Sequence, residues 1–210
     1  MSANASIIHF HPGGPLLALV GNPNCGKTAL FNRLTGSKQK VANYAGVTVE
    51  RKEGRLVTPG GKALRVLDLP GAYSLYPRSP DERITCDVLF GRAVGEKRPD
   101  LVVCVVDATN LRLHLRFVLE LRALGRPMLL GLNMMDDANR RGSQIDQALV
   151  SVKLGLPEVT TIATHADGVP GLLPQLDLEW RVWVAPVVTD GQDRHQQVRQ
   201  LLAETVKMSA

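Results

Sequence analysis

The segment that could do chemistry most directly is GNPNCGKT, at residues 21–28. Its spacing, GxxxxGK[ST], is that of a phosphate-binding loop, and it lies between the apolar run 16–20 and a helical pattern at 29–34. A glycine-rich turn between a strand and a helix presents backbone N–H groups and the positive helix end to an anion. A plain glycine-rich turn is the alternative, which the flanking strand and helix signals disfavour. The sequence therefore predicts a nucleoside triphosphate site.

Each residue type in this loop suits a phosphate ligand. Gly21 and Gly26 lack a side chain, which lets the backbone wrap closely around phosphate. Lys27 is placed to reach the β and γ oxygens, and the Thr28 hydroxyl to ligate Mg²⁺. The other loop residues assigned to nucleotide contact are Asn22, Pro23, Asn24, Cys25 and Ala29.

A second motif, DLPG at 68–71, follows another apolar strand pattern. Asp68 then lies at a strand end beside the phosphate loop, where a carboxylate can hold Mg²⁺ through water. The Gly71 N–H can reach the γ-phosphate. A strand-ending turn would produce the same pattern, but the order of motifs along the chain favours the nucleotide site.

A base-recognition motif, NMMD at 133–136, also follows an apolar strand. The Asp136 carboxylate can accept hydrogen bonds from N1–H and N2–H₂ of guanine, two donors that adenine lacks. Asn133 and Met134 are assigned to the same pocket. A helix cap formed by Asn or Asp after a strand is the structural alternative. GTP or GDP with Mg²⁺ is therefore the expected ligand.

Hydrophobic periodicity predicts the elements that must position these motifs. Strands are predicted at 16–20, 47–57, 63–67, 101–106, 127–132 and 158–162. Helices are predicted at 29–34, 112–124, 144–154 and 194–206. A further helix is predicted from a capping box with Ser79 as the N-cap, Pro80 at the first helical position and Glu82 three residues after the cap.

This order predicts an α/β fold of the P-loop NTPase class, a Ras-like G domain. Its apolar central strands predict a mostly parallel sheet with helices on both faces. The segments 47–57 and 63–67 flank the turn sequence TPGG and predict a hairpin, hence one antiparallel edge strand. Residues 1–168 are expected to form the GTP-binding domain and 169–210 a short C-terminal helical appendage, because prolines interrupt the pattern there.

Composition predicts a globular domain outside the membrane. The 210 residues are 44% hydrophobic, and no apolar run approaches the roughly 18 residues of a membrane-spanning helix. No secretory leader is recognised at 1–11, which predicts a cytosolic location. The three cysteines are scattered and predict neither a disulfide framework nor a zinc site. Cys104, in a strand, is expected to be inert packing.

The net charge of +5 leaves an RNA or membrane-surface partner as an alternative. Lys and Arg are spread along the chain, however, and an aromatic content of 4% leaves few platforms for base stacking. We therefore expect no nucleic-acid partner. The oligomeric state stays open.

Together these motifs resemble the translation-factor-like GTPases, and most closely the ferrous iron transport protein B family. The resemblance covers about residues 16–165 and rests on GNPNCGKTALFNRLTG at 21–36, NYAGVTVERKEG at 43–54, DLPGAYSLYPRSPDE at 68–82 and NMMD at 133–136. It implies a cytoplasmic GTPase domain that, in the family, precedes a helical domain and a polytopic membrane domain importing Fe²⁺. The implied partner is that membrane-spanning iron permease portion, at the bacterial inner membrane.

The resemblance also implies two segments that respond to the nucleotide. Thr48, with Gly46 and Val47, is similar to the family's switch I threonine, which ligates Mg²⁺ and senses the γ-phosphate. An exposed strand threonine is the alternative. Residues 37–47 and 70–79 are the implied moving parts.

Hydrolysis is implied to depend on backbone groups and a cation. Many GTPases place a glutamine directly after DxxG, whereas the side chain of Ala72 can neither donate nor accept a hydrogen bond. The resemblance implies that the backbone near Ala72 and Tyr73 holds the water and that Asn24 coordinates K⁺, which supplies the charge of an arginine finger. Asn24 as a turn former is the alternative. The residues assigned to slow, K⁺-stimulated hydrolysis are Asn24, Lys27, Thr48, Gly71 and Ala72.

Two features depart from the family pattern. The first is the last base-contacting loop, where related GTPases have a Ser-Ala pair and this chain has Ile162, Ala163 and Thr164. The Ala163 N–H can donate to guanine O6, but Ile162 lacks the hydroxyl that would stabilise the loop. This difference predicts faster nucleotide release or an unusual loop conformation. The resemblance also leads us to expect a shortened helical domain, in which only the segment 193–206 is similar to the family's closing helix.

Three functions stay open on the sequence alone. The first is a GTP-hydrolysing switch that regulates ferrous iron uptake. The second is an RNA- or ribosome-associated GTPase, slightly favoured by the basic pI although no RNA module is recognised. The third is a nucleotide-binding module with negligible turnover, made conceivable by Ala72 and Ile162.

Overall fold

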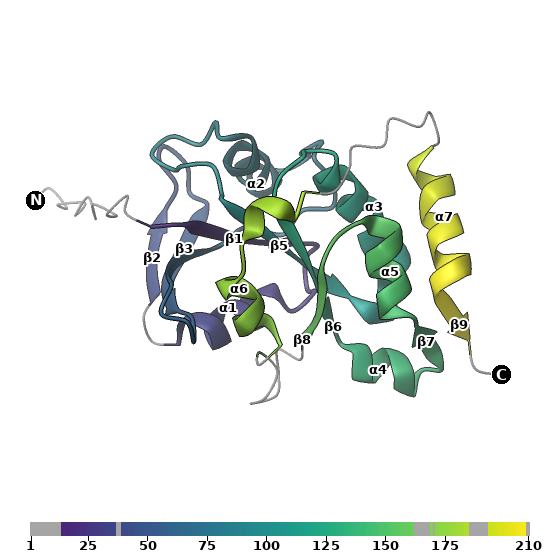
Figure 1. The fold of residues 1–210 in the computed structure, drawn as a ribbon. Coiled ribbons are helices and arrows are strands. Elements are labelled where there is room, and N and C mark those ends of the chain that lie inside the picture. Colours follow the sequence, from purple (N-terminus) through teal and green to yellow (C-terminus); the bar gives the residue numbers. More distant parts are fainter. Residues whose placement is uncertain (1–13, 37–38, 162–168, 170, 185–192, 209–210) are drawn as a thin grey trace, which may run out of the picture.

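The computed structural model describes residues 14–36, 39–161, 169, 171–184 and 193–208 (Figure 1). Its main sheet has seven strands in the order β2-β3-β4-β1-β5-β6-β8. Their bounds are β1 Leu16–Gly21, β2 Gln39–Asn43, β3 Glu50–Val57, β4 Ala63–Asp68, β5 Leu101–Asp107, β6 Met128–Asn133 and β8 Glu158–Thr161. Two short strands, β7 Ser143–Ile145 and β9 Val206–Met208, form a separate antiparallel pair.

The sheet is mostly parallel, as expected. Strand β1 runs parallel to its neighbours β4 and β5, and β6 runs parallel to β5 and β8. Strand β3 is antiparallel to both β4 and β2. The predicted hairpin is therefore confirmed, but the edge of the sheet is β2, a polar strand that the periodicity did not reveal.

Strand β3 begins three residues later than the sequence indicated because a tight turn precedes it. The Val47 N–H donates to the Tyr44 carbonyl at 3.2 Å, and the Tyr44 N–H to the Val49 carbonyl at 3.0 Å. Gly46 has φ +76°, a conformation that glycine adopts without strain. Residues 44–49 thus form a closed turn between β2 and β3.

The five predicted helices are present and differ from the prediction mainly at their ends, whereas α4 and α6 were not predicted. Their bounds are α1 Lys27–Thr35, α2 Pro80–Phe90, α3 Leu111–Arg122, α4 Met135–Arg140, α5 Gln147–Leu154, α6 Leu172–Asp177 and α7 Arg194–Thr205, with 3₁₀ turns at Ala108–Asn110 and Trp180–Val182. The capping box is confirmed, since the Glu82 N–H donates to Ser79 Oγ at 3.2 Å. The helix predicted from 144 begins at Gln147, because 143–145 pairs as β7.

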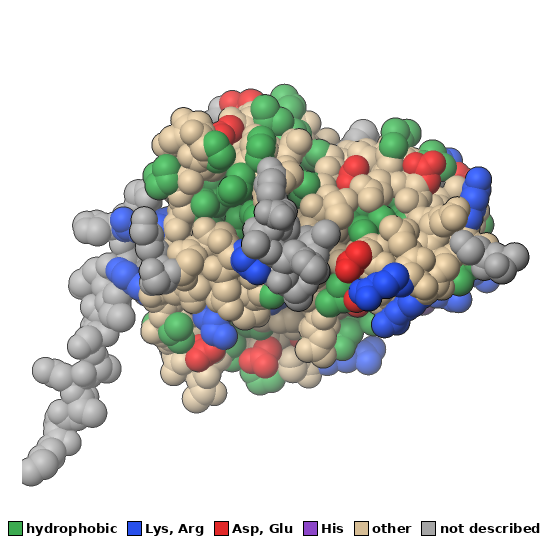
Figure 2. Space-filling model, turned by 90° about the horizontal axis from the view of Figure 1, so that it is seen from below, with side chains coloured by type: hydrophobic (Ala, Val, Ile, Leu, Met, Phe, Trp, Pro, Cys, Tyr) green, Lys and Arg blue, Asp and Glu red, His purple; other side chains and the backbone are tan. Residues whose placement is uncertain are grey.

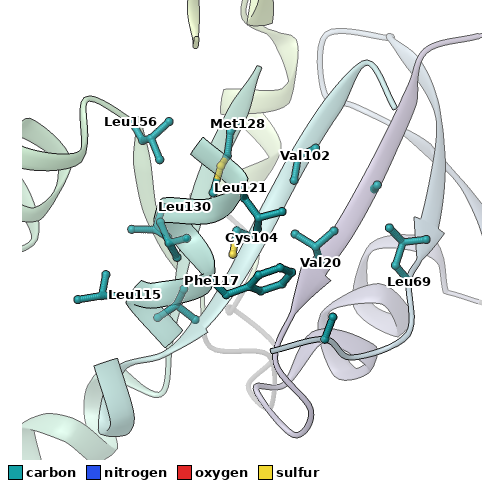
Figure 3. Close-up of a cluster of buried hydrophobic side chains, with 14 of the residues drawn as sticks. Val20, Leu69, Val102, Cys104, Leu115, Phe117, Leu121, Met128, Leu130 and Leu156 are labelled. Atoms are coloured by element: carbon teal, nitrogen blue, oxygen red, sulfur yellow. The ribbon is translucent and has the colours of Figure 1, made fainter. Parts of the chain in front are cut away.

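Alternate residues of the central strands enter two separate cores, one on each face. Leu17 and Leu19 pack with α1 and α6, whereas Ala18 and Val20 pack on the side of α2, α3 and α5. Figure 3 shows part of this second core, with Val20 and Cys104 of the sheet directed toward Phe117 of α3. Helices therefore cover both faces, which confirms the predicted fold class.

The C-terminal segment contributes to both cores. Helix α6 buries Leu172 and Leu176 beside α1, while α7 packs outside α3 and α5 through Val198 and Leu201 (Figure 1). The domain division at residue 168 stays a prediction. Within the described part of the chain, no helix is both long enough and apolar enough to cross a bilayer.

Candidate functional site

The predicted phosphate loop connects β1 to α1. The main chain takes left-handed conformations at Asn24 (φ +63°) and at Gly26 (φ +90°), after which α1 begins at Lys27. Asparagine tolerates this conformation better than most side chains do. A turn-forming role alone is therefore enough to account for Asn24, whose side chain is exposed.

The structure brings together three of the residues assigned to phosphate and Mg²⁺. Lys27 Nζ lies 2.8 Å from Asp68 Oδ1, and the Thr28 hydroxyl donates to Asp68 Oδ2 at 2.9 Å. Pairing of β1 with β4 opposes Leu19 to Asp68 and so fixes the carboxylate beside the loop. A carboxylate and a hydroxyl are the hard oxygen ligands that Mg²⁺ prefers, so these residues fit that ion. Binding it would require Asp68 to share its charge with Lys27.

The base-recognition motif is attached to the phosphate loop. The buried Asn133 side chain donates from Nδ2 to the Cys25 carbonyl at 3.0 Å. Met134 has φ +58°, an uncommon value for this residue type, and it turns the chain from β6 into α4. Asp136 follows in the first turn of α4, where its exposed carboxylate lies 3.4 Å from Arg140 Nη2. The aspartate is thus accessible to a base.

Cys25 contributes to the structure of the phosphate loop through its main chain, not through its thiol. Burial raises the pKa of its thiol to about 11, outweighing the opposing effects of hydrogen bonding at Lys27 and of the Lys27 charge. The thiol is therefore neutral near pH 7, and the residue as a whole is only 1% exposed. The main chain of Cys25 makes polar contacts in the loop: its carbonyl accepts from Asn133 Nδ2, and its N–H donates to the Asn22 carbonyl at 3.4 Å.

The start of the 70–79 segment, called here the switch II segment, packs on the phosphate loop. The Ala72 N–H donates to the Gly21 carbonyl at 3.1 Å. A Cβ at Gly71 would lie 2.9 Å from Cα, N and Cγ of Pro23, a distance that real Cβ atoms do not show. Gly71 is therefore required by close backbone approach, in addition to any contact with phosphate.

Side chains of α2 and α3 hold the rest of the switch II segment. Glu82 accepts from the N–H groups of Tyr73 at 3.2 Å and Arg78 at 2.7 Å. Thr85 Oγ1 donates to the Pro70 carbonyl at 2.7 Å, and Glu120 accepts from the Leu75 N–H at 2.7 Å. Sequence reasoning identified Glu82 only as part of a capping box and missed Thr85 and Glu120. The one available signal was a glutamate among the apolar positions of α3.

Thr48, the proposed switch I residue, is exposed on the turn 44–49. Among the residues that the structure describes, its side chain makes no hydrogen bond to the phosphate loop or to Asp68. Three residues further on, Arg51 enters a buried ion cluster with Glu53, Arg65 and Glu96. This cluster holds the beginning of β3 against β4 and against the loop before β5. The C-terminal end of the turn 44–49 is therefore anchored to the sheet.

Arginine contacts lower the pKa of Glu53 in this cluster. Burial alone would raise its pKa, but hydrogen bonds from Arg65 and Arg51 and their charges outweigh that effect. Arg65 donates from Nε and from Nη2 to the two carboxylate oxygens, each at 2.9 Å. Glu53 is therefore ionised at neutral pH.

Some predicted contacts lie outside the described residues. These are Ile162, Ala163 and Thr164 of the last base-contacting loop, and residues 37–38 before β2. On the face shown in Figure 2, Lys and Arg side chains are scattered in small groups among acidic and apolar ones. This distribution agrees with the dispersed charge of the sequence.

Comparisons with known proteins point to one family. Residues 16–176 match the family model described as ferrous iron transport protein B. The Fe(2+) transport protein A/Fe(2+) transporter FeoB fusion protein of Porphyromonas gingivalis is 43% identical over 171 residues, which are 80% of this chain and 20% of that protein. The chain thus spans about a fifth of the length of the curated relatives it matches.

Solved structures show the same similarity. The cytosolic domain of L. pneumophila FeoB is 30% identical with a TM-score of 0.81, and the match covers 91% of this chain and 99% of that one. A GDP-bound mutant of the S. thermophilus FeoB G domain is 39% identical with a TM-score of 0.70, over 84% of this chain and 64% of that one.

Proposed function

Because the chain belongs to the ferrous iron transport protein B family, we propose that it binds GTP and GDP with Mg²⁺ and hydrolyses GTP. The observation that carries this proposal is the convergence of Lys27 and Thr28 on Asp68, next to a loop that Asn133 holds from the base-recognition side. Lys27 and the loop amides bind the β- and γ-phosphates. Thr28 and Asp68 hold Mg²⁺, and Asp136 binds guanine.

Guanine recognition is tested by exchanging the roles of donor and acceptor at Asp136. Calorimetry with GDP and Mg²⁺ is expected to show binding, with no comparable signal for ADP. The Asp136→Asn variant replaces one acceptor oxygen with an N–H₂ donor. It is expected to lose GDP affinity and to gain affinity for xanthosine diphosphate, whose C2 oxygen accepts a hydrogen bond. Binding of ADP and GDP with equal affinity would contradict the proposal.

Hydrolysis requires the switch II segment to rearrange. The backbone N–H groups of Ala72 and Tyr73, which are proposed to hold the attacking water, donate here to the Gly21 carbonyl and to Glu82. They can hold water only after these bonds open. The γ-phosphate favours this movement because it attracts the Gly71 N–H and Thr48, as in other nucleotide-dependent switches.

Potassium stimulation is proposed to act through the Asn24 carboxamide. Its backbone and side-chain roles are separated by two variants, because Asn24→Gly keeps the left-handed conformation whereas Asn24→Ala strains it. Both variants are expected to hydrolyse GTP at the same rate in KCl and NaCl, while the unchanged chain is faster in KCl. Equal rates in the two salts for the unchanged chain would exclude the potassium site.

The proposed physiological role is regulation of ferrous iron transport by a membrane-spanning part of the transporter, at the cytoplasmic face of the membrane. A hybrid that joins this chain to the membrane part of the Salmonella typhimurium Fe(2+) transporter tests this role by uptake of labelled Fe²⁺. Uptake is expected to fall to the background level when Lys27→Ala removes phosphate binding. Equal uptake by the two hybrids would contradict a regulatory role.

A further inference from the structure

Glu120, a residue of α3 outside every nucleotide motif, contacts the switch II segment. Its side chain is only 1% exposed, on the face of the helix that also buries Phe117 and Leu121. One carboxylate oxygen, Oε2, accepts the Leu75 N–H at 2.7 Å. Burial of an ionised glutamate in this position lowers the stability of the fold unless its charge is compensated.

The other oxygen of the same carboxylate faces the C-terminal helix. Glu120 Oε1 lies 3.6 Å from Nη1 of Arg194, in the first turn of α7, and 3.6 Å from Nε of Arg116 on its own helix. It is buried and makes no hydrogen bond within the described part of the chain. Glu120 therefore lies between a main-chain donor of the switch II segment and a cation of α7.

The two contacts depend on each other. If the switch II segment moves and the Leu75 N–H departs, the buried carboxylate loses this 2.7 Å hydrogen bond. The free energy cost of that loss falls when a guanidinium closes from 3.6 Å to hydrogen-bond distance. The side chain of Arg194 is 42% exposed, which leaves it room to move. Tighter contact with α7 thus favours the moved state of switch II.

We propose that Glu120 is a positioning residue through which the C-terminal helix α7 sets the equilibrium of switch II, and through it the rate of GTP hydrolysis. This inference rests on the proposed GTPase function. The coupling is reciprocal, because a free-energy link between two elements acts equally in both directions. Rearrangement of switch II therefore changes the packing of the first turn of α7.

A double-mutant cycle of hydrolysis rates tests the link in the 210-residue chain. Arg194→Gln removes the cation that stabilises the moved state, so kcat is expected to fall on the order of fivefold with little change in GDP affinity. In a Glu120→Gln background the carboxylate charge is absent, so adding Arg194→Gln is expected to change kcat less than twofold. Arg199→Gln, an exposed change on the same helix, is the matched control and leaves kcat unchanged.

Hydrogen exchange provides a second test, because a purely structural role of Glu120 would not make exchange rates in α7 depend on the bound nucleotide. Replacing GDP by a non-hydrolysable GTP analogue is expected to slow exchange in the first turn of α7 and to accelerate it at Leu75. Arg194→Gln abolishes the change at α7, whereas Arg116→Gln retains it because Arg116 does not belong to α7.

The outcomes separate this inference from the proposed function. If calorimetry shows no binding of GDP with Mg²⁺, the GTPase proposal fails and the inference fails with it. If GDP binds but Arg194→Gln leaves kcat unchanged, only the inference is overturned. The same holds if Arg194→Gln has equal effects in the two backgrounds, or if exchange at α7 does not depend on the nucleotide.

Discussion

The side-chain amide of Asn133 donates to the main-chain carbonyl of Cys25 at 3.0 Å, across 108 residues of sequence and in a buried position. The register of the sheet places these residues near each other, because Gly21 is opposite Val105 and Asn133 is opposite Asp107 on neighbouring strands. The phosphate loop and the start of the base-recognition motif are therefore parts of one rigid frame. Recognition of the base and of the phosphates is expected to weaken together when this bond is removed.

Asn133→Ala is expected to reduce both stability and nucleotide affinity. The substitution leaves the Cys25 carbonyl buried without this donor, a loss of about 1–3 kcal/mol in the free energy of unfolding. Urea unfolding measures the first effect and GDP calorimetry the second. Asp136→Ala, an exposed change in the same motif, is the control and should weaken GDP binding at unchanged stability. Wild-type stability in Asn133→Ala would show that the bond does not support the frame.

Gly71→Ala is expected to lower the rate of GTP hydrolysis without a comparable loss of GDP affinity. The new Cβ would lie 2.9 Å from Pro23, so the start of the switch II segment must move away from the loop. Overpacking of this kind costs about 1–3 kcal/mol, and GDP lacks the γ-phosphate that the Gly71 N–H is proposed to contact. Single-turnover GTP hydrolysis should fall by about tenfold or more, while GDP affinity changes little. A rate equal to that of the unchanged chain would show that the Gly71 backbone does not need its present position.

The candidate site residues that sequence reasoning placed together, as the structure also does, belong to short local motifs. The phosphate loop, Asp68 and the NMMD motif each follow a strand directly, so strand order alone brings them to one edge of the sheet. Strand β2 was missed because its residues, QKVAN, lie at the edge and lack an apolar alternation. Glu120 was missed for a different reason: its partners, Leu75 and Arg194, are distant in sequence, and no spacing rule connects them.

Acid is expected to destabilise the chain through Glu53. The folded-state pKa of this carboxyl is lower than its ordinary value of 4.5, because the contacts from Arg65 and Arg51 outweigh burial. A depressed pKa stabilises the folded state at pH values above the ordinary pKa. This stability is lost as the pH falls through the folded value. Urea unfolding between pH 7 and about pH 3 should therefore show a decline.

The Glu53→Gln variant tests the origin of this decline. It removes the titrating group, so the slope of stability against pH should become shallower below the ordinary pKa of 4.5. It also removes the negative charge that compensates two buried arginines, which should lower the free energy of unfolding by about 3–5 kcal/mol at neutral pH. Glu50→Gln is the control, because the Glu50 side chain is exposed and its pair with Lys52 should contribute little. An unchanged slope in Glu53→Gln would assign the acid sensitivity to other carboxylates.

All three cysteine thiols are expected to be unreactive in the folded chain. Burial raises the pKa of Cys25 and of Cys86 to about 11 in each case, and that of Cys104 well above its ordinary value. At pH 8 a thiol with a pKa near 11 is ionised in about one molecule in a thousand, and the thiolate is the reactive form. Ellman's reagent should therefore detect almost no thiol in the native chain and all three in urea. Rapid reaction of one thiol in the native chain would show that its surroundings open on the time scale of the assay. At Cys25 such opening would mean that the loop between β1 and α1 is not held by Asn133.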